Sequence, residues 1–415
     1  VFAPTIRYNN GRFYMVTTND TTHRNFYVYT DDIHGEWSDP ITIDQDGIDP
    51  SLYFEDGRAF FISNGTDCEG KGGVVQCEIN IETGEKLTES RCIWQGSGGR
   101  YLESPHMYKI GKYYYLMAAE GGTEYGHMIT YARSESVWGK FEGYPHNPVL
   151  TNRNKAPFII QGIGHGDLIQ DKNGEWHIIC LGFRQIHMWM TYHHLGRECF
   201  LIPVTFHEDG WFTAGNGTCE ESYELSGDFA QLPLKTYTLE NIGHDICHLR
   251  HPHTENYSIT KDKITLKGTD VTLDDVASPT FAGVRQRDFD MDCSVSVSVS
   301  DGEGGLTVYS CETEHYDLAL RKNESGYEAI LRLNIGGIRH VEKAVQIPSG
   351  SAKLIIRSDS QVYKFFVQSQ SEEIPMGFAM SKYLSSEVCG GFTGTVIGMY
   401  AVKGSAEFTD LRISY

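Results

Sequence analysis

A hairpin pattern that recurs along the first half of the chain is the feature that most constrains the fold. In residues 101–120, YLESPHMYKIGKYYYLMAAE, an apolar strand leads into a tight glycine turn, and a second strand dense in tyrosine follows. The same pattern surrounds Gly11, Gly57 and Gly174, so the copies recur at intervals of about 45 to 65 residues, as expected for propeller blades of four short strands. Because helical periodicity is absent from this half, we expect an all-β structure.

Polar residues occupy matching positions in these hairpins. Asp49 stands before one first strand, next to a proline, and Glu103 stands before another, next to a Ser-Pro pair. The segment GHGDLIQ of a third copy carries His165 and Asp167. In a ring of repeated units, equivalent positions face a common axis, so we expect these groups to meet in one central pocket.

The charge and the apolar content limit the class of partner. The formal net charge is −20, with an isoelectric point near 5.2, so the summed field repels nucleic acids and anionic membranes and suits a neutral substrate. No run approaches the ~18 apolar residues of a membrane span. We therefore expect neither a nucleic-acid nor a membrane partner, and the oligomeric state is left open. The 24 Tyr, 20 Phe and 6 Trp favour β-structure first, and flat rings also suit sugar binding.

Cysteines and histidines give no metal motif. Ten cysteines are spread from Cys68 to Cys389 without metal-ligand spacing, and several stand in apolar strand contexts, so we expect free buried thiols. Histidines gather in FRQIHMWMTYHHLGRE, but no cysteine or carboxylate spacing completes a tetrahedral zinc site there.

A cytoplasmic location is favoured, and a secreted or periplasmic location is the alternative.

The second half of the chain has a different texture. SVSVSVS at residues 294–300 alternates strictly, as a half-buried strand does. Further short strands follow, separated by Gly, Asn, Asp and Ser, and strands at this spacing predict a β-sandwich. We therefore expect an incomplete propeller domain at residues 1–235 and a β-sandwich domain at residues 236–415.

Several of these pieces together resemble family 43 glycoside hydrolases. They are APTIRY, GIDPSLYF, ESPHMYKIGKYYYL, GHGDLIQ and YHHLGREC in the first half, with ASPTFAGVRQ and GFTGTVIGMYA in the second. The resemblance covers nearly the whole chain in order and spacing. It implies a five-bladed β-propeller, of which four blades are evident here, followed by a C-terminal β-sandwich. Similar members include β-xylosidases and α-L-arabinofuranosidases that release pentoses from hemicellulose.

The resemblance also implies catalytic roles. Glu103 in ESPHMYK matches the family's general acid, and Asp49 in GIDPSLYF matches the aspartate that raises the pKa of that acid. On local sequence alone, Glu103 is an ordinary surface residue and Asp49 an ordinary turn residue. The family's general base is an aspartate on the first blade. No segment here matches it, so we expect that base and its blade upstream of Val1, outside this sequence.

Two further residues are implied to lie in the pocket. His165 is expected at the propeller centre beneath the sugar, through a calcium ion and its waters, although Ca²⁺ prefers oxygen ligands to imidazole. Arg184 in LGFRQ is expected to hydrogen-bond sugar hydroxyls, with a surface salt bridge as the alternative reading. No organic cofactor is expected.

These expectations combine into one leading function and one alternative. The leading function is an exo-acting, inverting glycoside hydrolase that releases xylose or arabinose from hemicellulose oligosaccharides such as xylan or arabinoxylan fragments. The choice between xylosidase and arabinofuranosidase stays open, and both activities in one pocket are compatible with the sequence. The alternative is a carbohydrate-binding propeller without hydrolysis, because the motif of the general base is not found in the sequence.

Overall fold

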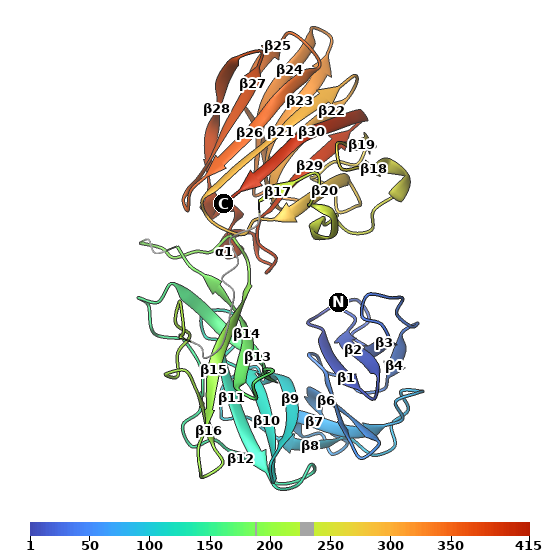
Figure 1. The fold of residues 1–415 in the computed structure, drawn as a ribbon, viewed down its shortest axis with the longest axis vertical. Coiled ribbons are helices and arrows are strands. Elements are labelled where there is room, and N and C mark those ends of the chain that lie inside the picture. The colour runs from blue at the N-terminus through green and yellow to red at the C-terminus, as the bar shows by residue number, and fades with distance from the viewer. Residues whose placement is uncertain (187–188, 225–235) are drawn as a thin grey trace. The chain divides into compact units, whose positions relative to one another are not determined.

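The computed structural model describes residues 1–186, 189–224 and 236–415 (Figure 1). The chain divides into two compact units. The first unit holds Val1–Phe183 and Glu198–Gly227, and the second holds Arg184–Arg197 and Asp228–Tyr415. The domain boundary expected at residue 235 falls in the stretch 225–235, which lies outside the described residues, as does His187 of the histidine-rich run.

Four four-stranded sheets build the first unit, and each follows chain order from one strand to the next. The first two sheets consist of β1 (Thr5–Asn9), β2 (Arg12–Thr18), β3 (Asn25–Thr30) and β4 (Ile41–Ile43), then β5 (Ser51–Glu55), β6 (Arg58–Thr66), β7 (Gly72–Ile79) and β8 (Arg91–Trp94). The last two consist of β9 (Glu103–Ile110), β10 (Tyr113–Glu120), β11 (Met128–Ser134) and β12 (Glu142–Gly143), then β13 (Ile160–Gln170), β14 (Trp176–Arg184), β15 (Glu198–Phe206) and β16 (Phe212–Ala214).

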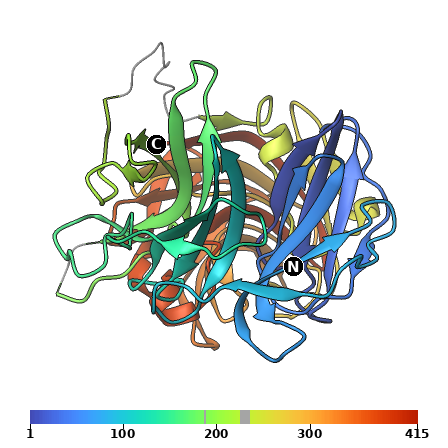
Figure 2. The ribbon, with the colours of Figure 1, turned by 90° about the horizontal axis from the view of Figure 1, so that it is seen from below.

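These sheets are the predicted blades, and their first strands are the inner ones. Strands β1, β5, β9 and β13 lie beside one another in that order (Figure 2). Each is joined to the next strand by the tight turn that the sequence predicts. Gly11 and Gly57, for example, adopt φ of 90° and 75° in these turns, a backbone region that favours glycine.

Aromatic side chains fill the space between blades. Tyr131 of β11 stacks on Phe212 of β16 with ring centroids 3.9 Å apart, and its hydroxyl donates a hydrogen bond of 2.7 Å to the Phe212 carbonyl. Tyr115 belongs to the same buried cluster, and Phe206 packs against it from a partly buried position. Much of the aromatic content therefore packs the core, the simpler of the two uses that the composition allowed.

The second unit is a β-sandwich of two antiparallel sheets. The larger sheet runs in the order β18-β19-β30-β21-β26-β27-β28, with β17 also paired to β30: β17 (Tyr237–Thr238), β18 (Tyr257–Ile259), β19 (Ile264–Gly268), β21 (Met291–Val299), β26 (Ser351–Ser358), β27 (Val362–Ser369), β28 (Glu372–Met380) and β30 (Gly404–Ser414). The smaller runs β20-β29-β22-β23-β24-β25: β20 (Thr280–Arg285), β22 (Glu303–Cys311), β23 (Glu314–Asn323), β24 (Gly326–Ile335), β25 (Ile338–Ile347) and β29 (Val396–Val402). The all-β propeller and sandwich predicted from the sequence are confirmed.

Alternation along β21 explains why SVSVSVS forms a strand at the centre of the larger sheet. Val295, Val297 and Val299 are buried in the apolar core of the sandwich, whereas Ser296 and Ser298 on the other face are only half-buried. This is the period of two that the sequence shows.

Helices are few and short in the part of the chain that the structure describes. Three are 3₁₀ turns, η1 (Gly243–Asp245), η2 (Thr254–Asn256) and η3 (Ser381–Leu384), and one is an α-helical turn, α1 (Ser386–Cys389). Within the described residues, no helix has the length and apolar character needed to cross a membrane. All ten cysteines are free thiols.

Residues 184–197 lie between two strands of the propeller in the chain, yet they pack within the second unit. His193 Nδ1 lies 2.7 Å from Glu387 Oε1 in α1. Arg285 donates a hydrogen bond of 2.9 Å to the Leu195 carbonyl, and the Thr395 amide donates one of 2.8 Å to the His194 carbonyl. The sequence did not predict this assignment, because a hairpin pattern shows which strands pair but not where a long connection packs.

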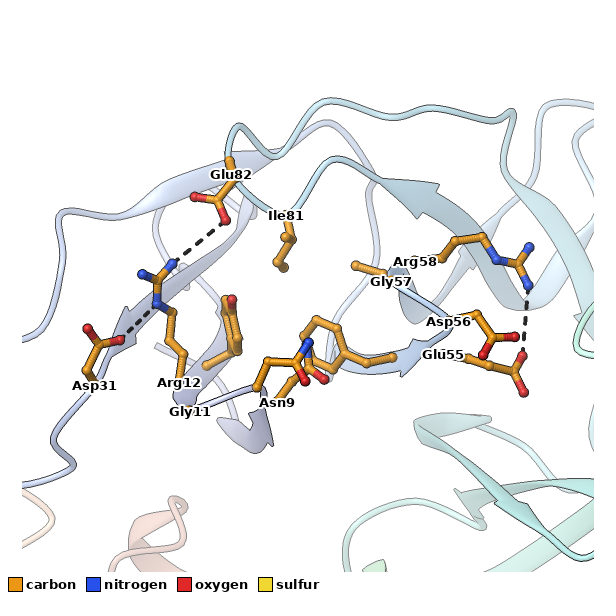
Figure 3. Close-up of a pocket in the computed structure, with 14 residues that line it drawn as sticks. Asn9, Gly11, Arg12, Asp31, Glu55, Asp56, Gly57, Arg58, Ile81 and Glu82 are labelled. Carbon is orange, nitrogen blue, oxygen red and sulfur yellow. Dashed lines mark hydrogen bonds and ion pairs between the residues drawn. The ribbon is translucent and has the colours of Figure 1, made fainter.

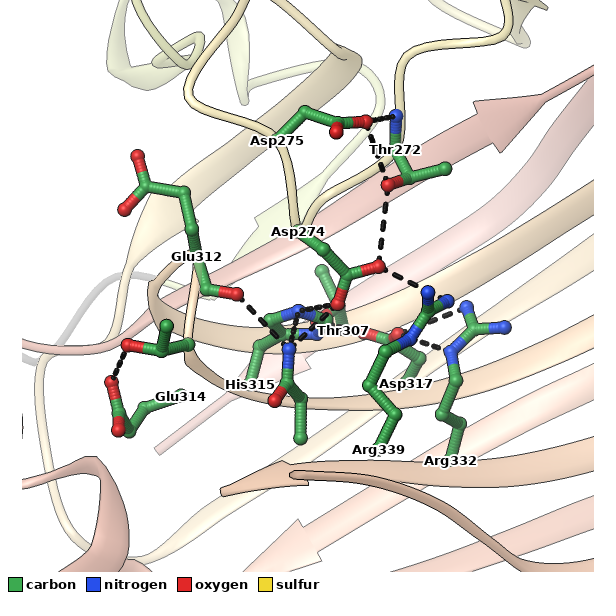
Figure 4. A network of polar contacts seen from close by, with 12 residues as sticks. Thr272, Asp274, Asp275, Thr307, Glu312, Glu314, His315, Asp317, Arg332 and Arg339 are labelled. Atoms are coloured by element: carbon green, nitrogen blue, oxygen red, sulfur yellow. Dashed lines mark hydrogen bonds and ion pairs between the residues drawn. The ribbon is translucent and has the colours of Figure 1, made fainter. Parts of the chain in front are cut away.

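A buried polar network crosses the smaller sheet of the sandwich (Figure 4). His315 lies 2.9 Å from Asp317 and 3.2 Å from Asp274, one carboxylate at each ring nitrogen. Arg332 joins Asp317 at 3.0 Å and Glu303 at 2.6 Å. Burial would lower the pKa of His315, but Asp317 and Asp274 outweigh it and raise the pKa to about 9. The imidazole is therefore a cation at neutral pH, held between two carboxylates.

Candidate active site

The inner strands of three blades bring the predicted site residues together. Asp49 stands two residues before β5, Glu103 opens β9, and His165 lies within β13. The His165 ring nitrogen Nδ1 is 3.9 Å from Asp49 Oδ2, and the charge of Asp49 acts on Glu103. Asp49 is buried, while Glu103 and His165 are half-buried. Side chains far apart in the chain thus share one half-buried polar region, as the repeat pattern predicts.

The electrostatics of Glu103 suit proton donation. Burial raises the pKa of its carboxyl, and the negative charge of Asp49 raises it further, to about 7. An ordinary glutamate titrates near 4.5, so Glu103 holds a proton at neutral pH far more often than an ordinary carboxyl does. A group that keeps its proton near the working pH can transfer it to a departing oxygen.

The backbone is strained where these side chains leave it. Asp49, Ser104 and His165 adopt positive φ values of 53°, 54° and 47°, which cost non-glycine residues of order 1–3 kcal/mol each. The Ser51 hydroxyl donates a buried hydrogen bond of 2.6 Å to the Pro105 carbonyl, which ties the start of β5 to the start of β9. The Asp-Pro-Ser and Glu-Ser-Pro motifs are therefore linked to each other.

Four further side chains form a polar floor under this region. Arg7 of β1 donates two hydrogen bonds to Asp167 of β13, at 2.6 and 3.0 Å, and a third of 2.9 Å to Nδ1 of His106. The Tyr108 hydroxyl donates to the same Asp167 carboxylate and accepts a hydrogen bond of 2.9 Å from the Leu168 amide. The floor thus joins three inner strands.

The proton positions in this floor follow from the contacts. A guanidinium only donates, so Nδ1 of His106 accepts and its proton lies on Nε2, 3.3 Å from the Ser104 hydroxyl. Burial lowers the pKa of His106 to about 3, so the ring is neutral. Burial would raise the pKa of Asp167, but the charge of Arg7 and the hydrogen bonds from Arg7 and Tyr108 outweigh it and lower the pKa to about 2. Asp167 is therefore an ionised, paired carboxylate that holds the floor together.

Sequence reasoning singled out Asp167 but missed Arg7, His106 and Tyr108. A usable signal existed, because Arg7 stands in the first strand of its hairpin, and His106 and Tyr108 alternate along the inner strand that begins with Glu103. Their partnership depends on the register between blades, which one sequence does not reveal.

Three glycines in GIGHG explain how β13 presents His165. A Cβ added to Gly162 would come within 2.2 Å of the Phe183 ring, and one added to Gly164 within 2.3 Å of the His127 ring. Gly166 is similarly blocked by Ile129. One face of the strand is thus bare so that neighbouring side chains pack directly on its backbone, and the alternate face carries His165 and Asp167.

Arg184, predicted to bind sugar hydroxyls, groups with the second unit. Its guanidinium lies 3.1 Å from Asp288 Oδ1, donates a hydrogen bond of 2.9 Å to the Arg287 carbonyl, and stacks 5.0 Å from the Phe289 ring. These contacts hold Arg184 in the sandwich unit, and its sugar-binding role stays a prediction.

The histidine-rich run does not form a cluster of metal ligands among its described residues. His193 pairs with Glu387, whereas His194 is fully buried against aromatic rings, including those of Phe289 and Tyr363. Burial lowers the pKa of His194 to about 3, so this ring is neutral.

A separate hollow of about 810 Å³ lies at the other end of the first two inner strands, where β1 and β5 turn into the next strand (Figure 3). Its charged groups pair among themselves: Arg12 Nε is 3.0 Å from Asp31, and Arg58 is 3.9 Å from Glu55. Because Glu55 ends β5 and Asp49 precedes it, this hollow and the candidate active site lie at opposite ends of the strand.

Comparison with known proteins identifies the family. Residues 1–212 match the sequence profile of glycosyl hydrolases family 43, and residues 235–412 match the β-xylosidase C-terminal concanavalin A-like domain. The chain belongs to glycosyl hydrolases family 43. As a family 43 member it is a glycoside hydrolase, as its sequence predicts.

Two family 43 relatives match the chain over most of its length. A non-reducing end α-L-arabinofuranosidase, BoGH43B of Bacteroides ovatus, is 36% identical over 96% of this chain and 78% of its own length. A xylosidase/arabinosidase of Butyrivibrio fibrisolvens is 30% identical over 97% of this chain and 82% of its own.

Solved family 43 structures share the fold. The structure titled Bacteroides ovatus Xyloglucan PUL GH43B has a TM-score of 0.90 at 35% identity and covers 99% of this chain and 84% of its own. The xylan β-1,4-xylosidase of Bacillus halodurans has a TM-score of 0.90 at 26% identity and covers 100% of this chain and 86% of its own.

Proposed function

We propose that this family 43 hydrolase is an exo-acting, inverting enzyme that removes a terminal xylose or arabinose from hemicellulose oligosaccharides. The relatives' names, an arabinofuranosidase and a xylosidase/arabinosidase, support the pentose class. The observation that carries the proposal is the half-buried Glu103, whose pKa is raised to about 7 beside Asp49.

In this mechanism Glu103 is the general acid that protonates the glycosidic oxygen as the bond to the sugar breaks. Asp49 keeps the proton on Glu103 until then, because a second negative charge beside Asp49 is unfavourable. Inversion also needs a carboxylate that activates water on the opposite face of the sugar, roughly 6.5–9.5 Å from the acid. Asp167 does not suit that role, because Arg7 and Tyr108 already occupy its carboxylate.

The proposed calcium at the centre fits the described residues poorly. The groups beside each other there are one imidazole, His165, and one carboxylate, Asp49, 3.9 Å away. The nearby Asp167 is committed to its ion pair with Arg7. Ca²⁺ takes six to eight oxygen ligands, so waters would have to supply most of its shell.

The test compares the full-length enzyme with a Glu103→Gln variant on two kinds of substrate. With an oligosaccharide such as xylobiose, whose leaving alkoxide needs a proton, we expect kcat/KM to fall by about 10²–10⁴-fold. With 4-nitrophenyl β-D-xyloside and 4-nitrophenyl α-L-arabinofuranoside, whose leaving group departs readily as an anion, we expect a much smaller loss. The parent's ratio of activities on the two nitrophenyl glycosides then assigns the preferred pentose.

Glu142→Gln is the matched control, since Glu142 is an exposed glutamate on β12 of the same blade. It should leave both activities at the parent level. If Glu103→Gln hydrolysed xylobiose as fast as the parent, the assignment of Glu103 would be wrong. Loss of activity on all substrates in equal proportion would point to misfolding or to a role other than acid catalysis.

A carbohydrate-binding propeller without hydrolysis is not favoured. Both relatives described above carry the names of hydrolases, and a purely binding site has no need of a carboxyl with its pKa raised to about 7. Calorimetry that shows xylose binding, together with no release of sugar from any of the substrates above, would reverse this preference.

A further inference from the structure

Three potential metal ligands converge at the turn between β13 and β14. The sequence there is DKNGEWH, and Asp171, Glu175 and His177 place their ligand atoms within 4.8 Å of one another. This group is separate from His165, which lies further back along β13. Two carboxylates and one imidazole at such spacing form a donor set that a single ion can bridge.

His177 is the member that an ordinary turn does not explain. Its side chain lies on β14 opposite Pro203, and the residue is only 2% exposed. Within the described part of the chain, no hydrogen bond or ion pair reaches its imidazole. Coordination to a cation through a ring nitrogen would give this imidazole the polar partner that the described residues do not supply.

Asp171 is already held in place as a ligand. One carboxylate oxygen accepts hydrogen bonds from the Asn173 amide at 2.8 Å and the Glu175 amide at 2.9 Å. The other oxygen has a contact of 3.5 Å with the Asn173 side chain.

An ion can reach these side chains. Glu175 and His177 line an open hollow of about 480 Å³, which Glu224 also lines. The net charge of −20 raises the local concentration of cations around the protein. Waters from the hollow can complete the coordination shell.

We propose that Asp171, Glu175 and His177 bind a divalent transition-metal ion of the zinc class and that this ion clamps the β13–β14 hairpin. An imidazole nitrogen with two carboxylate oxygens suits Zn²⁺, whereas Ca²⁺ prefers an all-oxygen shell. The clamp stabilises the hairpin, whose first strand carries His165 and Asp167. The ion takes no part in bond cleavage.

Isothermal titration of the full-length, untagged protein with ZnCl₂ and with CaCl₂, after dialysis against a chelator, tests the site. We expect one zinc ion to bind with a dissociation constant in the micromolar range or tighter, at least 100-fold tighter than calcium. X-ray absorption of the zinc-loaded protein should show oxygen and nitrogen neighbours with one imidazole. Zinc should also raise the Tm of the unfolding transition followed by tryptophan fluorescence.

Variants separate this site from the other histidines and carboxylates on the surface. Glu175→Gln, a change at an exposed turn residue, should weaken zinc binding by at least tenfold, and His177→Gln should abolish the tight site. Glu208→Gln is the matched control, because it alters an exposed glutamate in the β15–β16 turn of the same blade and should bind zinc as the parent does.

Zinc binding that is no tighter than calcium binding would overturn the proposal, and so would equal zinc affinity in the parent and Glu175→Gln. If His177→Gln failed to fold, Glu175→Gln and Asp171→Asn would still decide the outcome. Loss of zinc affinity in the Glu208→Gln control would assign the ion to a different surface.

Discussion

Asp49 and Glu103 stand at the starts of two adjacent inner strands, and the charge of Asp49 adds to burial in raising the pKa of Glu103 to about 7. The Ser51–Pro105 hydrogen bond of 2.6 Å fixes the two strand starts to each other. This buried side-chain to backbone contact therefore holds the two strand starts next to each other.

The first prediction concerns the pH profile of Asp49→Asn. Removing the negative charge makes the proton on Glu103 easier to lose, so the alkaline limb of kcat/KM for an oligosaccharide should move to lower pH, by about one unit. Burial of Glu103 stays, so the limb should not fall to that of a free glutamate. The measurement is kcat/KM from pH 4 to 9.

Asp56→Asn serves as the control for this profile, because Asp56 lies in the turn at the far end of β5. It should leave the alkaline limb where the parent has it. An unchanged limb in Asp49→Asn would show that the charge of Asp49 does not act on Glu103.

The second prediction concerns the stability of Glu103→Gln. The folded-state pKa of Glu103 is raised from 4.5 to about 7, so its ionisation disfavours the folded state as pH rises through this interval. Below pH 4.5 the carboxyl is protonated in both states and the penalty vanishes. At pH 8 the free energy of unfolding should be about 1–2 kcal/mol larger for the variant than for the parent, allowing for solvent screening.

Urea unfolding followed by tryptophan fluorescence at pH 4.5 and pH 8 measures this difference. All six tryptophans precede residue 212, and residues 236–415 contain none, so the signal reports mainly on the propeller. An advantage of the variant that is the same at both pH values would contradict the raised pKa.

The third prediction concerns Arg7→Lys in the polar floor. Lysine keeps the positive charge but lacks the planar guanidinium whose two terminal nitrogens reach both Asp167 oxygens and His106 Nδ1. We expect a loss of about 2 kcal/mol in unfolding free energy and a lower kcat, because Ser104 beside Glu103 loses its ordered neighbour. Arg12→Lys, at the exposed pair with Asp31, is the control and should change stability by less than about 0.5 kcal/mol.

The fourth prediction concerns the sandwich. The folded-state pKa of His315 is raised to about 9, so its stabilising charge is fully present below the ordinary value of 6.5 and is lost as pH rises through 9. The stability of the second unit should therefore fall by about 2 kcal/mol between pH 6.5 and 9.5. Asp317→Asn should be less stable at pH 6.5 and should lose most of this pH dependence.

Calorimetric unfolding of the full-length protein resolves this effect, because the propeller transition can be identified separately by tryptophan fluorescence. If the sandwich transition of the parent were flat between pH 6.5 and 9.5, His315 would be neutral in the folded protein.

Much of the architecture was predictable because local sequence patterns indicate it. A glycine turn between two apolar strands identifies a hairpin wherever it occurs, and the turns at Gly11, Gly57 and Gly174 all lie where the sequence places them. The alternation in residues 294–300 likewise needs no partner strand to be recognised.

The polar floor was not predictable, for a physical reason. Arg7 and Asp167 are 160 residues apart, and their contact depends on how inner strands of different blades line up. The partners of Arg184 were not predictable either, because Asp288 lies between strands of the sandwich and stands in no distinctive motif. Asp49 and Glu103 could be identified from local motifs. The groups that surround them depend on the register between inner strands of different blades.

Residues 184–197 pack within the second unit, and this limits the order in which the chain can fold as it is made. His193 and Glu387 are 194 residues apart, so on the ribosome this segment emerges long before the strands and turn that cover it. Folding cannot then run strictly from the first domain to the last. If two relatives exchanged C-terminal domains, residues 184–197 would have to be exchanged together with the C-terminal domain in which they pack.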